Sequence, residues 1–137
     1  MLHTVFVKDF MSQYVLSFRP DQEIIDAARM LADRRVSGAP VVNELGTLVG
    51  VLSDTDCIEA TIKAGFDEGW RGLVSEYMSP NVATVEPNDS ILDVSKRFIT
   101  DRYRRYPVVE DNRLVGQISR LDILRALDFI QTRKKRG

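Results

Sequence analysis

The chain has 137 residues, 44% hydrophobic and 28% charged, a balance typical of one compact globular domain. Its 19 basic and 20 acidic residues give a net charge of −1, which excludes a general attraction to nucleic acid or to membranes. One cysteine, Cys57, excludes an intrachain disulfide, and one histidine, His3, excludes sites built from several histidines. No apolar run approaches the roughly 18 residues of a membrane span, so we expect a cytoplasmic protein.

The sequence contains one pattern twice. Met11, Pro20, Asp26 and Pro40 recur 67 positions later as Met78, Pro87, Asp93 and Pro107, and Gly50, Ser53 and Asp56 recur 66 positions later as Gly116, Ser119 and Asp122. The offset changes by one residue inside a predicted turn, where folds tolerate deletions. We therefore expect a duplicated unit. The first copy covers residues 1–65 with an N-terminal segment, residues 66–73 form a connector, and the second copy covers residues 74–137 with a basic C-terminal tail.

Each copy begins with a Met-Ser pair, and the residues that follow predict a short strand and then a helix. The strands cover residues 15–18 and 82–85 and end before a proline. Asp21 and Asn88 follow these prolines and are expected to be the helix N-caps. Helical spacing of apolar residues predicts the helices that follow, at Ile24, Ala28 and Leu31 in the first copy and at Ile91, Val94 and Phe98 in the second.

A hairpin and a second helix complete each copy. Two apolar runs separated by a short polar turn predict the hairpin, with strands at residues 41–42 and 48–52 and again at residues 108–109 and 114–118. A helix is then expected to begin near Ser53 and near Ser119. The predicted order is strand, helix, strand, strand, helix in both copies.

The residues best suited to chemistry are a Ser-x-x-Asp motif at the start of each second helix, Ser53 to Asp56 and Ser119 to Asp122. Amides in the first turn of a helix are unpaired and attract an anion or a hydroxyl. The aspartate can accept two hydrogen bonds from a ribose diol. The same motif is a capping box, in which serine caps the helix and the acid bonds back to the backbone. Taken alone, the motif favours the cap.

The ordered set of motifs resembles the CBS domain, named after cystathionine β-synthase, over about residues 7–127. The second copy carries the family pattern as Met78-Ser79, Thr84-Val85-Glu86-Pro87, Pro107-Val108-Val109, Leu114-Val115-Gly116 and Ser119-x-x-Asp122. The first copy is similar, with Ser17-Phe18-Arg19-Pro20 at its strand end. The resemblance implies an α/β (α+β) fold of two β-α-β-β-α units, packed sheet to sheet with pseudo-two-fold symmetry.

The resemblance also implies a non-catalytic regulatory module. It binds AMP, ADP, ATP or S-adenosylmethionine in clefts between the units, needs no obligatory cofactor or metal, forms a homodimer and signals to an unidentified effector protein. In such proteins the motif aspartate holds the ribose, the serine lies beside the phosphate or ribose, and backbone near the Pro-Val strand meets the adenine edge. The implied ligand-binding residues are Ser17, Ala39, Pro40, Val41, Ser53, Asp56, Thr84, Arg104, Arg105, Tyr106, Pro107, Val108, Ser119, Arg120 and Asp122.

The two copies differ in charge around this motif. The second copy carries Arg120, Arg104 and Arg105, where the first carries Asp54, Ser37 and Gly38. Because a guanidinium suits phosphate and a carboxylate repels it, we expect the stronger nucleotide site at Asp122. The alternative is that Arg102, Arg104 and Arg105 form a solvated strand edge or pair with acidic neighbours, and phosphate arginines in the family can also serve a neighbouring unit or subunit.

Three other functions remain as alternatives. A ligand-free structural dimerisation module, with its clefts closed by side chains, fits the same motifs. An enzyme would need a base, a nucleophile or a metal cluster, and the sequence offers only isolated carboxylates. Nucleic-acid binding would have to use the arginines at residues 102–105 and the basic tail, which we expect to be solvated instead.

Overall fold

The computed structural model describes residues 4–64 and 71–136, so His3 and most of the connector lie outside it. The chain divides into two compact units. The central unit consists of Leu16–Val82, and the terminal unit combines Met1–Val15 with Ala83–Gly137. Each unit therefore takes most of its structure from one copy of the repeat, but its Met-Ser pair from the other copy.

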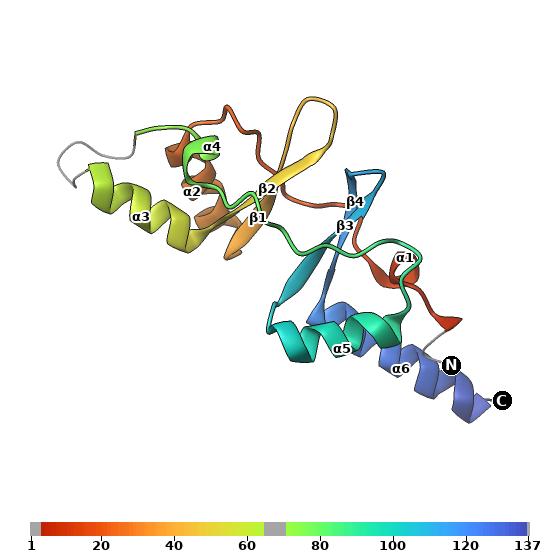
Figure 1. Cartoon of the computed structure of the whole chain (residues 1–137). Helices are drawn as coiled ribbons and strands as arrows, with labels where there is room; N and C mark the ends of the chain where they lie inside the picture. The colour runs from red at the N-terminus through yellow and green to blue at the C-terminus, as the bar shows by residue number, and fades with distance from the viewer. Residues whose placement is uncertain (1–3, 65–70, 137) are drawn as a thin grey trace. The chain divides into compact units, whose positions relative to one another are not determined.

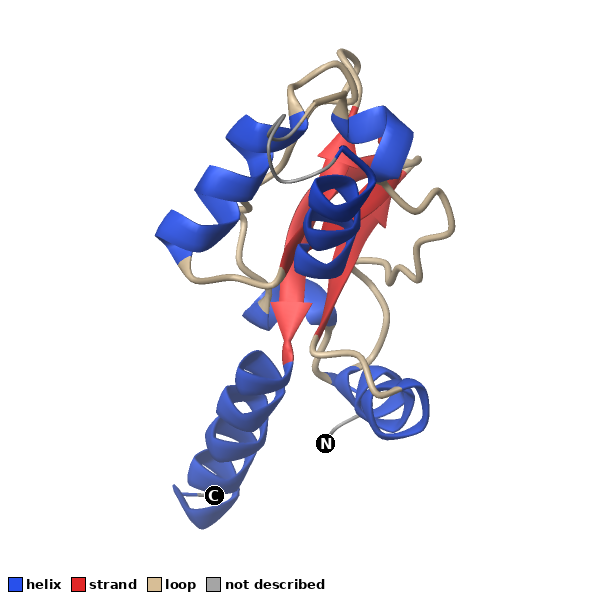
Figure 2. Ribbon diagram, turned by 90° about the vertical axis from the view of Figure 1, so that its left-hand side faces the viewer, coloured by secondary structure: helices blue, strands red, loops and turns tan. Residues whose placement is uncertain are grey.

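In both units a helix, two strands and a second helix follow one another in the predicted order (Figure 1). The central unit contains α2 (Ile24–Arg34), β1 (Gly38–Val42), β2 (Leu48–Ser53), α3 (Asp54–Ala64) and α4 (Val74–Tyr77). The terminal unit contains α1 (Val7–Phe10), α5 (Ile91–Asp101), β3 (Arg105–Glu110), β4 (Arg113–Ser119) and α6 (Arg120–Arg136). The mixed helix-and-strand fold expected from the sequence is confirmed, and Figure 2 shows its strands in red and its helices in blue.

The N-caps of the two longer first helices differ from the prediction. Helix α2 begins after Glu23 and α5 begins after Ser90, whose Oγ accepts a hydrogen bond from the Asp93 amide at 3.1 Å. The prediction of Asp21 and Asn88 is therefore wrong by two residues in each case. Both residues lie instead in a turn between the proline and the helix.

Each unit contains an antiparallel hairpin that is extended on both edges by single bridges. In the central unit β1 pairs with β2, Phe18 forms a parallel bridge with β1, and Ser79 forms an antiparallel bridge with β2. In the terminal unit the same places are taken by Val85 beside β3 and Ser12 beside β4. The first predicted strand of each copy is thus only one bridge long.

The glycine of each Leu-Val-Gly motif makes room for the exchanged Met-Ser pair. A Cβ atom at Gly50 would lie 2.7 Å from the Sδ of Met78 and 2.9 Å from the carbonyl oxygen of Ser79. A Cβ atom at Gly116 would lie 2.7 Å from the Ser12 carbonyl oxygen. All three distances are shorter than the contacts that real Cβ atoms make, so only glycine permits this approach.

The one-turn helices α1 and α4 dock the exchanged segments. The amide of Lys8 donates to the Pro87 carbonyl at 2.9 Å, and the amide of Ser75 donates to the Pro20 carbonyl at 3.0 Å. Met11 and Met78 pack against the cores of the two units. Within the described part of the chain, no helix has both the length and the apolar character needed to cross a bilayer.

Candidate functional site

In each unit three chain segments meet where the hairpin passes into the second helix. In the central unit the amide of Phe18 donates to the Pro40 carbonyl at 2.9 Å, which sets Ser17 beside the start of β1. Gly38, the first residue of β1, pairs with Ser53, the last residue of β2. We call the junction of these segments the central corner.

The terminal unit repeats this arrangement as the terminal corner. The amide of Val85 donates to the Pro107 carbonyl at 3.1 Å, which sets Thr84 beside β3. Arg105, the first residue of β3, pairs with Ser119 at the end of β4. The predicted site residues therefore divide cleanly. The central corner collects Ser17, Ala39, Pro40, Val41, Ser53 and Asp56, and the terminal corner collects Thr84, Arg104, Arg105, Tyr106, Pro107, Val108, Ser119, Arg120 and Asp122.

The central Ser-x-x-Asp motif forms a complete capping box. The Ser53 amide donates to Oδ2 of Asp56 at 2.8 Å, and the Asp56 amide donates to Oγ of Ser53 at 3.2 Å. Asp56 is half-buried, and among the described residues no donor bonds its other oxygen, Oδ1. A carboxylate accepts about four hydrogen bonds in total, so the cap leaves most of its capacity unused.

In the terminal motif the aspartate accepts more hydrogen bonds than in the central one. Oδ2 of Asp122 accepts from the amide of Ser119 at 2.8 Å and from its hydroxyl at 3.1 Å. Oδ1 of Asp122 accepts from Arg125 at 3.1 Å. Asp122 is only 7% exposed, and these three donors compensate for the burial of its charge. One acceptor position on Oδ1 remains.

The first-turn amides of the two helices differ in a way that the sequence did not reveal. In α3 the amide of Asp54 bonds the Ser37 carbonyl, and the amide of Thr55 bonds the Asp54 carboxylate at 2.7 Å. The Asp56 amide is taken by the cap, so the expectation of unpaired amides is wrong for this helix. In α6 the amide of Arg120 bonds the Arg104 carbonyl, but no acceptor in the described structure bonds the amide of Leu121.

The arginines of the terminal corner have separate structural roles. Arg120 donates from Nε to the Tyr103 carbonyl at 2.8 Å and from a terminal nitrogen to the Phe98 carbonyl at 3.4 Å. It therefore caps the carboxyl end of α5. The side chains of Arg104 and Arg105 have no acceptor among the described residues, and neither is buried. These two guanidinium groups are the ones available to an anion.

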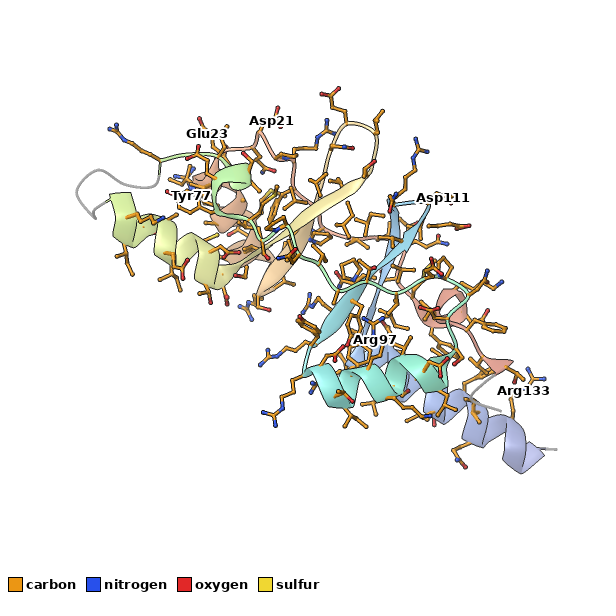
Figure 3. The ribbon with its side chains drawn as sticks, viewed as in Figure 1. Asp21, Glu23, Tyr77, Arg97, Asp111 and Arg133 are labelled. Carbon is orange, nitrogen blue, oxygen red and sulfur yellow. The ribbon has the colours of Figure 1, made fainter. Side chains whose placement is uncertain are left out.

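A cluster that sequence reasoning missed supports the terminal corner. Arg97, labelled in Figure 3, donates to the Thr84 carbonyl at 2.7 Å and lies 4.6 Å from the ring centre of Tyr106. The Tyr106 hydroxyl donates to Asp101 at 3.0 Å. Burial and this hydrogen bond raise the pKa of Tyr106 to about 12. The repeat offers one signal for this cluster, because Met30 takes the place of Arg97 in the first copy.

Two further features lie outside the predicted ligand contacts. Burial, reinforced by the charges of Asp56 and Asp54, raises the pKa of the Cys57 thiol to about 11. A surface pocket in the terminal unit contains none of the corner residues and is lined by Thr4, Val5, Asp9, Phe10, Phe129 and Arg133. In the part of the chain that the structure describes, no three His, Cys, Asp or Glu side chains gather as a metal site would require.

Comparison with known sequences identifies the repeat. The sequence matches the CBS domain over residues 7–63 and again over residues 74–128. CBS domain-containing protein YhcV of Bacillus subtilis is 37% identical over 117 residues, which cover 85% of this chain and 81% of that protein. The chain spans 42% of the length of another relative, the uncharacterized protein MJ1225 of Methanocaldococcus jannaschii, which is 28% identical over 121 residues.

Solved structures with the same fold contain adenosyl ligands. One of them is CBSX2, a CBS-pair protein of Arabidopsis thaliana, in complex with AMP. It superposes with a TM-score of 0.79 at 29% identity, and the superposition covers 93% of this chain and 98% of the CBSX2 chain. The CBS domain pair of protein MJ0100, in complex with 5′-methylthioadenosine and S-adenosyl-L-methionine, superposes with a TM-score of 0.72 at 26% identity. The superposition covers 90% of this chain and 96% of the MJ0100 chain.

Proposed function

The chain belongs to the CBS domain family, and we propose that it is a non-catalytic regulatory module that binds an adenosyl ligand at its two strand-to-helix corners. The observation that carries this proposal is the convergence of three segments on a Ser-x-x-Asp turn in both units. The complexes of CBSX2 with AMP and of MJ0100 with two adenosyl compounds support it, because all these ligands share adenine and ribose.

The capping boxes are compatible with ribose binding. In both motifs the cap occupies Oδ2. Oδ1 of Asp56 accepts from no donor among the described residues, and Oδ1 of Asp122, which accepts from Arg125, keeps one position for a ribose hydroxyl. We infer that Asp56 and Asp122 have both tasks, since one oxygen fixes the helix start while the other faces the sugar. The backbone of the neighbouring β1 and β3 then supplies hydrogen-bonding groups for the adenine edge.

The two corners are proposed to prefer ligands of different charge. The central unit has 11 acidic and 6 basic residues, a net charge of −5, whereas the terminal unit has 9 acidic and 13 basic residues, a net charge of +4. In α3 the Thr55 amide, which an anion would use, already donates to the Asp54 carboxylate. In the terminal corner the Leu121 amide, Arg104 and Arg105 are available. A phosphorylated ligand therefore favours the terminal corner, and S-adenosylmethionine suits the central one.

The proposal includes two partners. One is a second copy of the chain, which the family resemblance implies. The other is an effector protein, because a module without catalytic groups has to pass its signal by contact. Ligand binding changes such a contact only if the ligand has different affinities for two states of the module.

A second candidate is a ligand-free structural module. The observation in its favour is the deep burial of Asp122, whose carboxylate already holds three donors of the chain. In that case both aspartates serve as helix caps alone. The two candidates predict different responses of the folded protein to adenosyl compounds.

Thermal unfolding with and without ligand separates these candidates. A ligand that binds only the folded chain adds about 2.7 kcal/mol at a hundredfold excess over Kd, which raises Tm by several degrees. We expect this increase with AMP, ATP or S-adenosylmethionine, and none with inorganic phosphate as the control at the same concentration. An unchanged Tm with all three adenosyl compounds would contradict ligand binding and favour the structural module.

A further inference from the structure

The carboxyl ends of the equivalent helices α2 and α5 are closed in different ways. At the end of α2 the amide of Val36 donates to the Leu31 carbonyl at 3.1 Å, so the backbone closes this helix by itself. In α5 the equivalent carbonyl belongs to Phe98 and the equivalent amide to Tyr103, and among the described residues no backbone bond joins them. Arg120 of α6 supplies the donors instead, because its guanidinium bonds the Tyr103 carbonyl at 2.8 Å and the Phe98 carbonyl at 3.4 Å.

Arg120 thereby fixes two consecutive peptide groups beside the terminal corner. Its Nε donates to the carbonyl of Tyr103 at 2.8 Å, and its amide donates to the carbonyl of Arg104 at 3.1 Å. Because a peptide group is planar, the orientations of the two planes on either side of a residue determine its φ and ψ. Arg104 lies between these two planes. Arg120 therefore determines the direction in which the Arg104 side chain leaves the backbone.

The central unit has neither this side-chain contact nor a cation for it to place. The residue equivalent to Arg120 is Asp54, whose carboxylate bonds an amide of its own helix. The Asp54 amide bonds the Ser37 carbonyl at 2.8 Å, but no side chain in the described structure bonds the carbonyl of Val36. Ser37, the residue equivalent to Arg104, carries no charge. The contact and the basic residue therefore occur together in one copy of the repeat and are absent together from the described part of the other.

We propose that Arg120 is a positioning residue for Arg104 and that it thereby sets the preference of the terminal corner for phosphorylated ligands. This inference rests on the proposed function. The Arg104 side chain is exposed, and its guanidinium has no acceptor among the described residues. A backbone that is already held in one conformation reduces the conformational entropy lost when this side chain binds a phosphate. Arg120 acts through the backbone and does not itself contact the phosphate.

Two substitutions of Arg120 separate its hydrogen bond from its charge. Arg120→Gln keeps a donor nitrogen at the same place along the side chain as Nε, whereas Arg120→Met keeps a similar length without a donor. The affinities of the full chain for AMP and for adenosine are measured by calorimetry. Arg120→Met should weaken AMP binding about tenfold and adenosine binding less than about twofold, and Arg120→Gln should bind AMP within about threefold of wild type. Arg113→Met removes the same charge at the far end of the β3–β4 hairpin and is the matched control, which should bind both compounds like wild type.

A double-mutant cycle tests whether Arg120 acts through Arg104. Arg104→Met alone should weaken AMP binding about tenfold, and adding Arg120→Met to it should cause no further loss. Additive losses in the double variant, or equal losses of AMP affinity in Arg120→Gln and Arg120→Met, would overturn the proposal. Both results are expected of a guanidinium that contacts the phosphate itself.

Limited digestion with trypsin gives a readout that needs no ligand. Arg102 and Arg104 lie in the segment that Arg120 holds, so trypsin should cleave after them several-fold faster in Arg120→Met than in wild type. Arg34 and Arg35, at the backbone-closed end of α2, are internal controls whose cleavage should not change. An unchanged rate at Arg102 and Arg104 would overturn the positioning role.

These measurements also separate failure of this inference from failure of the proposed function. If wild type binds AMP and Arg120→Met binds it equally well, only the role of Arg120 is rejected. If wild type binds neither AMP nor adenosine, the proposed function fails and the ligand preference fails with it. The digestion then still decides whether Arg120 holds the segment before β3.

Discussion

Ser53 and Asp56 bond one another in both directions at the start of α3, through the Ser53 amide at 2.8 Å and the Asp56 amide at 3.2 Å. Ser119 and Asp122 repeat this geometry at the start of α6. The aspartates proposed to bind ribose are therefore also structural residues. Any test of ligand binding has to separate lost contacts to the ligand from lost stability of the fold.

Replacing the aspartates should cost unequal amounts of stability. Asp56→Ala removes one helix cap and should lower the free energy of unfolding by about 1 kcal/mol. Asp122→Ala leaves the partly buried amide and hydroxyl of Ser119 without their acceptor, while the exposed Arg125 turns to solvent, so we expect a loss of about 1–3 kcal/mol. Urea denaturation measures both changes. Glu59→Ala, at an exposed position of α3, is the control, and equal losses for all three variants would contradict these roles of the two aspartates.

The glycines under the Met-Ser pairs should not tolerate alanine. Gly116→Ala places a methyl group 2.7 Å from a backbone oxygen, and Gly50→Ala places one 2.7 Å from the flexible Met78 side chain. We expect losses of about 1–3 kcal/mol at both positions, because each methyl group would also lie less than 3.0 Å from a second atom, the Ser79 carbonyl oxygen at Gly50 and the Met11 sulfur at Gly116. Gly46→Asn is the control, because no atom lies within 4 Å and asparagine tolerates its φ of +81°. A Gly116→Ala chain as stable as wild type would show that the exchanged segment docks elsewhere.

Arg97 should stabilise the terminal corner through the Thr84 carbonyl. Arg97→Met installs the residue found at the equivalent place in the first copy, so it fits the fold but loses the 2.7 Å hydrogen bond and the contact with Tyr106. We expect a loss of about 1–2 kcal/mol and faster exchange of the neighbouring Val85 amide with solvent. Lys96→Met on the exposed side of α5 should change neither quantity. Unchanged exchange at Val85 in Arg97→Met would contradict this role.

Alkaline pH should destabilise the chain in a specific range. The pKa values of Cys57 and Tyr106 rise on folding, from 9.0 to about 11 and from 10.0 to about 12, so the folded state holds these protons longer than the unfolded state. Their contribution is complete below pH 9 and is lost as the pH rises toward 12. Urea denaturation at several pH values in this range should show that the free energy of unfolding declines less in Cys57→Ala and in Tyr106→Phe than in wild type. If stability declines equally in wild type and in both variants, groups other than Cys57 and Tyr106 cause the loss.

Local patterns in the sequence predicted the longer helices and the hairpin of each unit well. The hairpins and the helices that follow them occur where apolar spacing and polar turns indicated, and Ile91, Val94 and Phe98 are all buried. The N-caps were misplaced because a Pro-Asp pair begins a turn as readily as a helix. In the second copy the true cap, Ser90, lies two residues later and ahead of the first buried isoleucine.

Contacts between residues far apart in the sequence determine the features that local sequence patterns could not predict. The exchange of the Met-Ser pairs depends on backbone bonds between distant segments, such as the one from Ser75 to Pro20, and no local pattern encodes these bonds. Arg120 was predicted beside a phosphate, but folding brings the carbonyls of Phe98 and Tyr103 to its guanidinium. Its role as a ligand contact, like those of the other corner residues, stays a prediction.

Calorimetric titration of wild type, Asp56→Ala and Asp122→Ala with AMP, ATP and S-adenosylmethionine measures whether the two motif aspartates hold the ligand. Each variant is first checked for folding under the conditions of the titration. We expect Asp122→Ala to weaken AMP and ATP binding at least about tenfold, which is the loss expected for one or two charge-assisted hydrogen bonds. Asp56→Ala should affect these nucleotides less and S-adenosylmethionine more. A folded Asp122→Ala variant that binds both nucleotides as tightly as wild type would show that Asp122 does not hold the ligand.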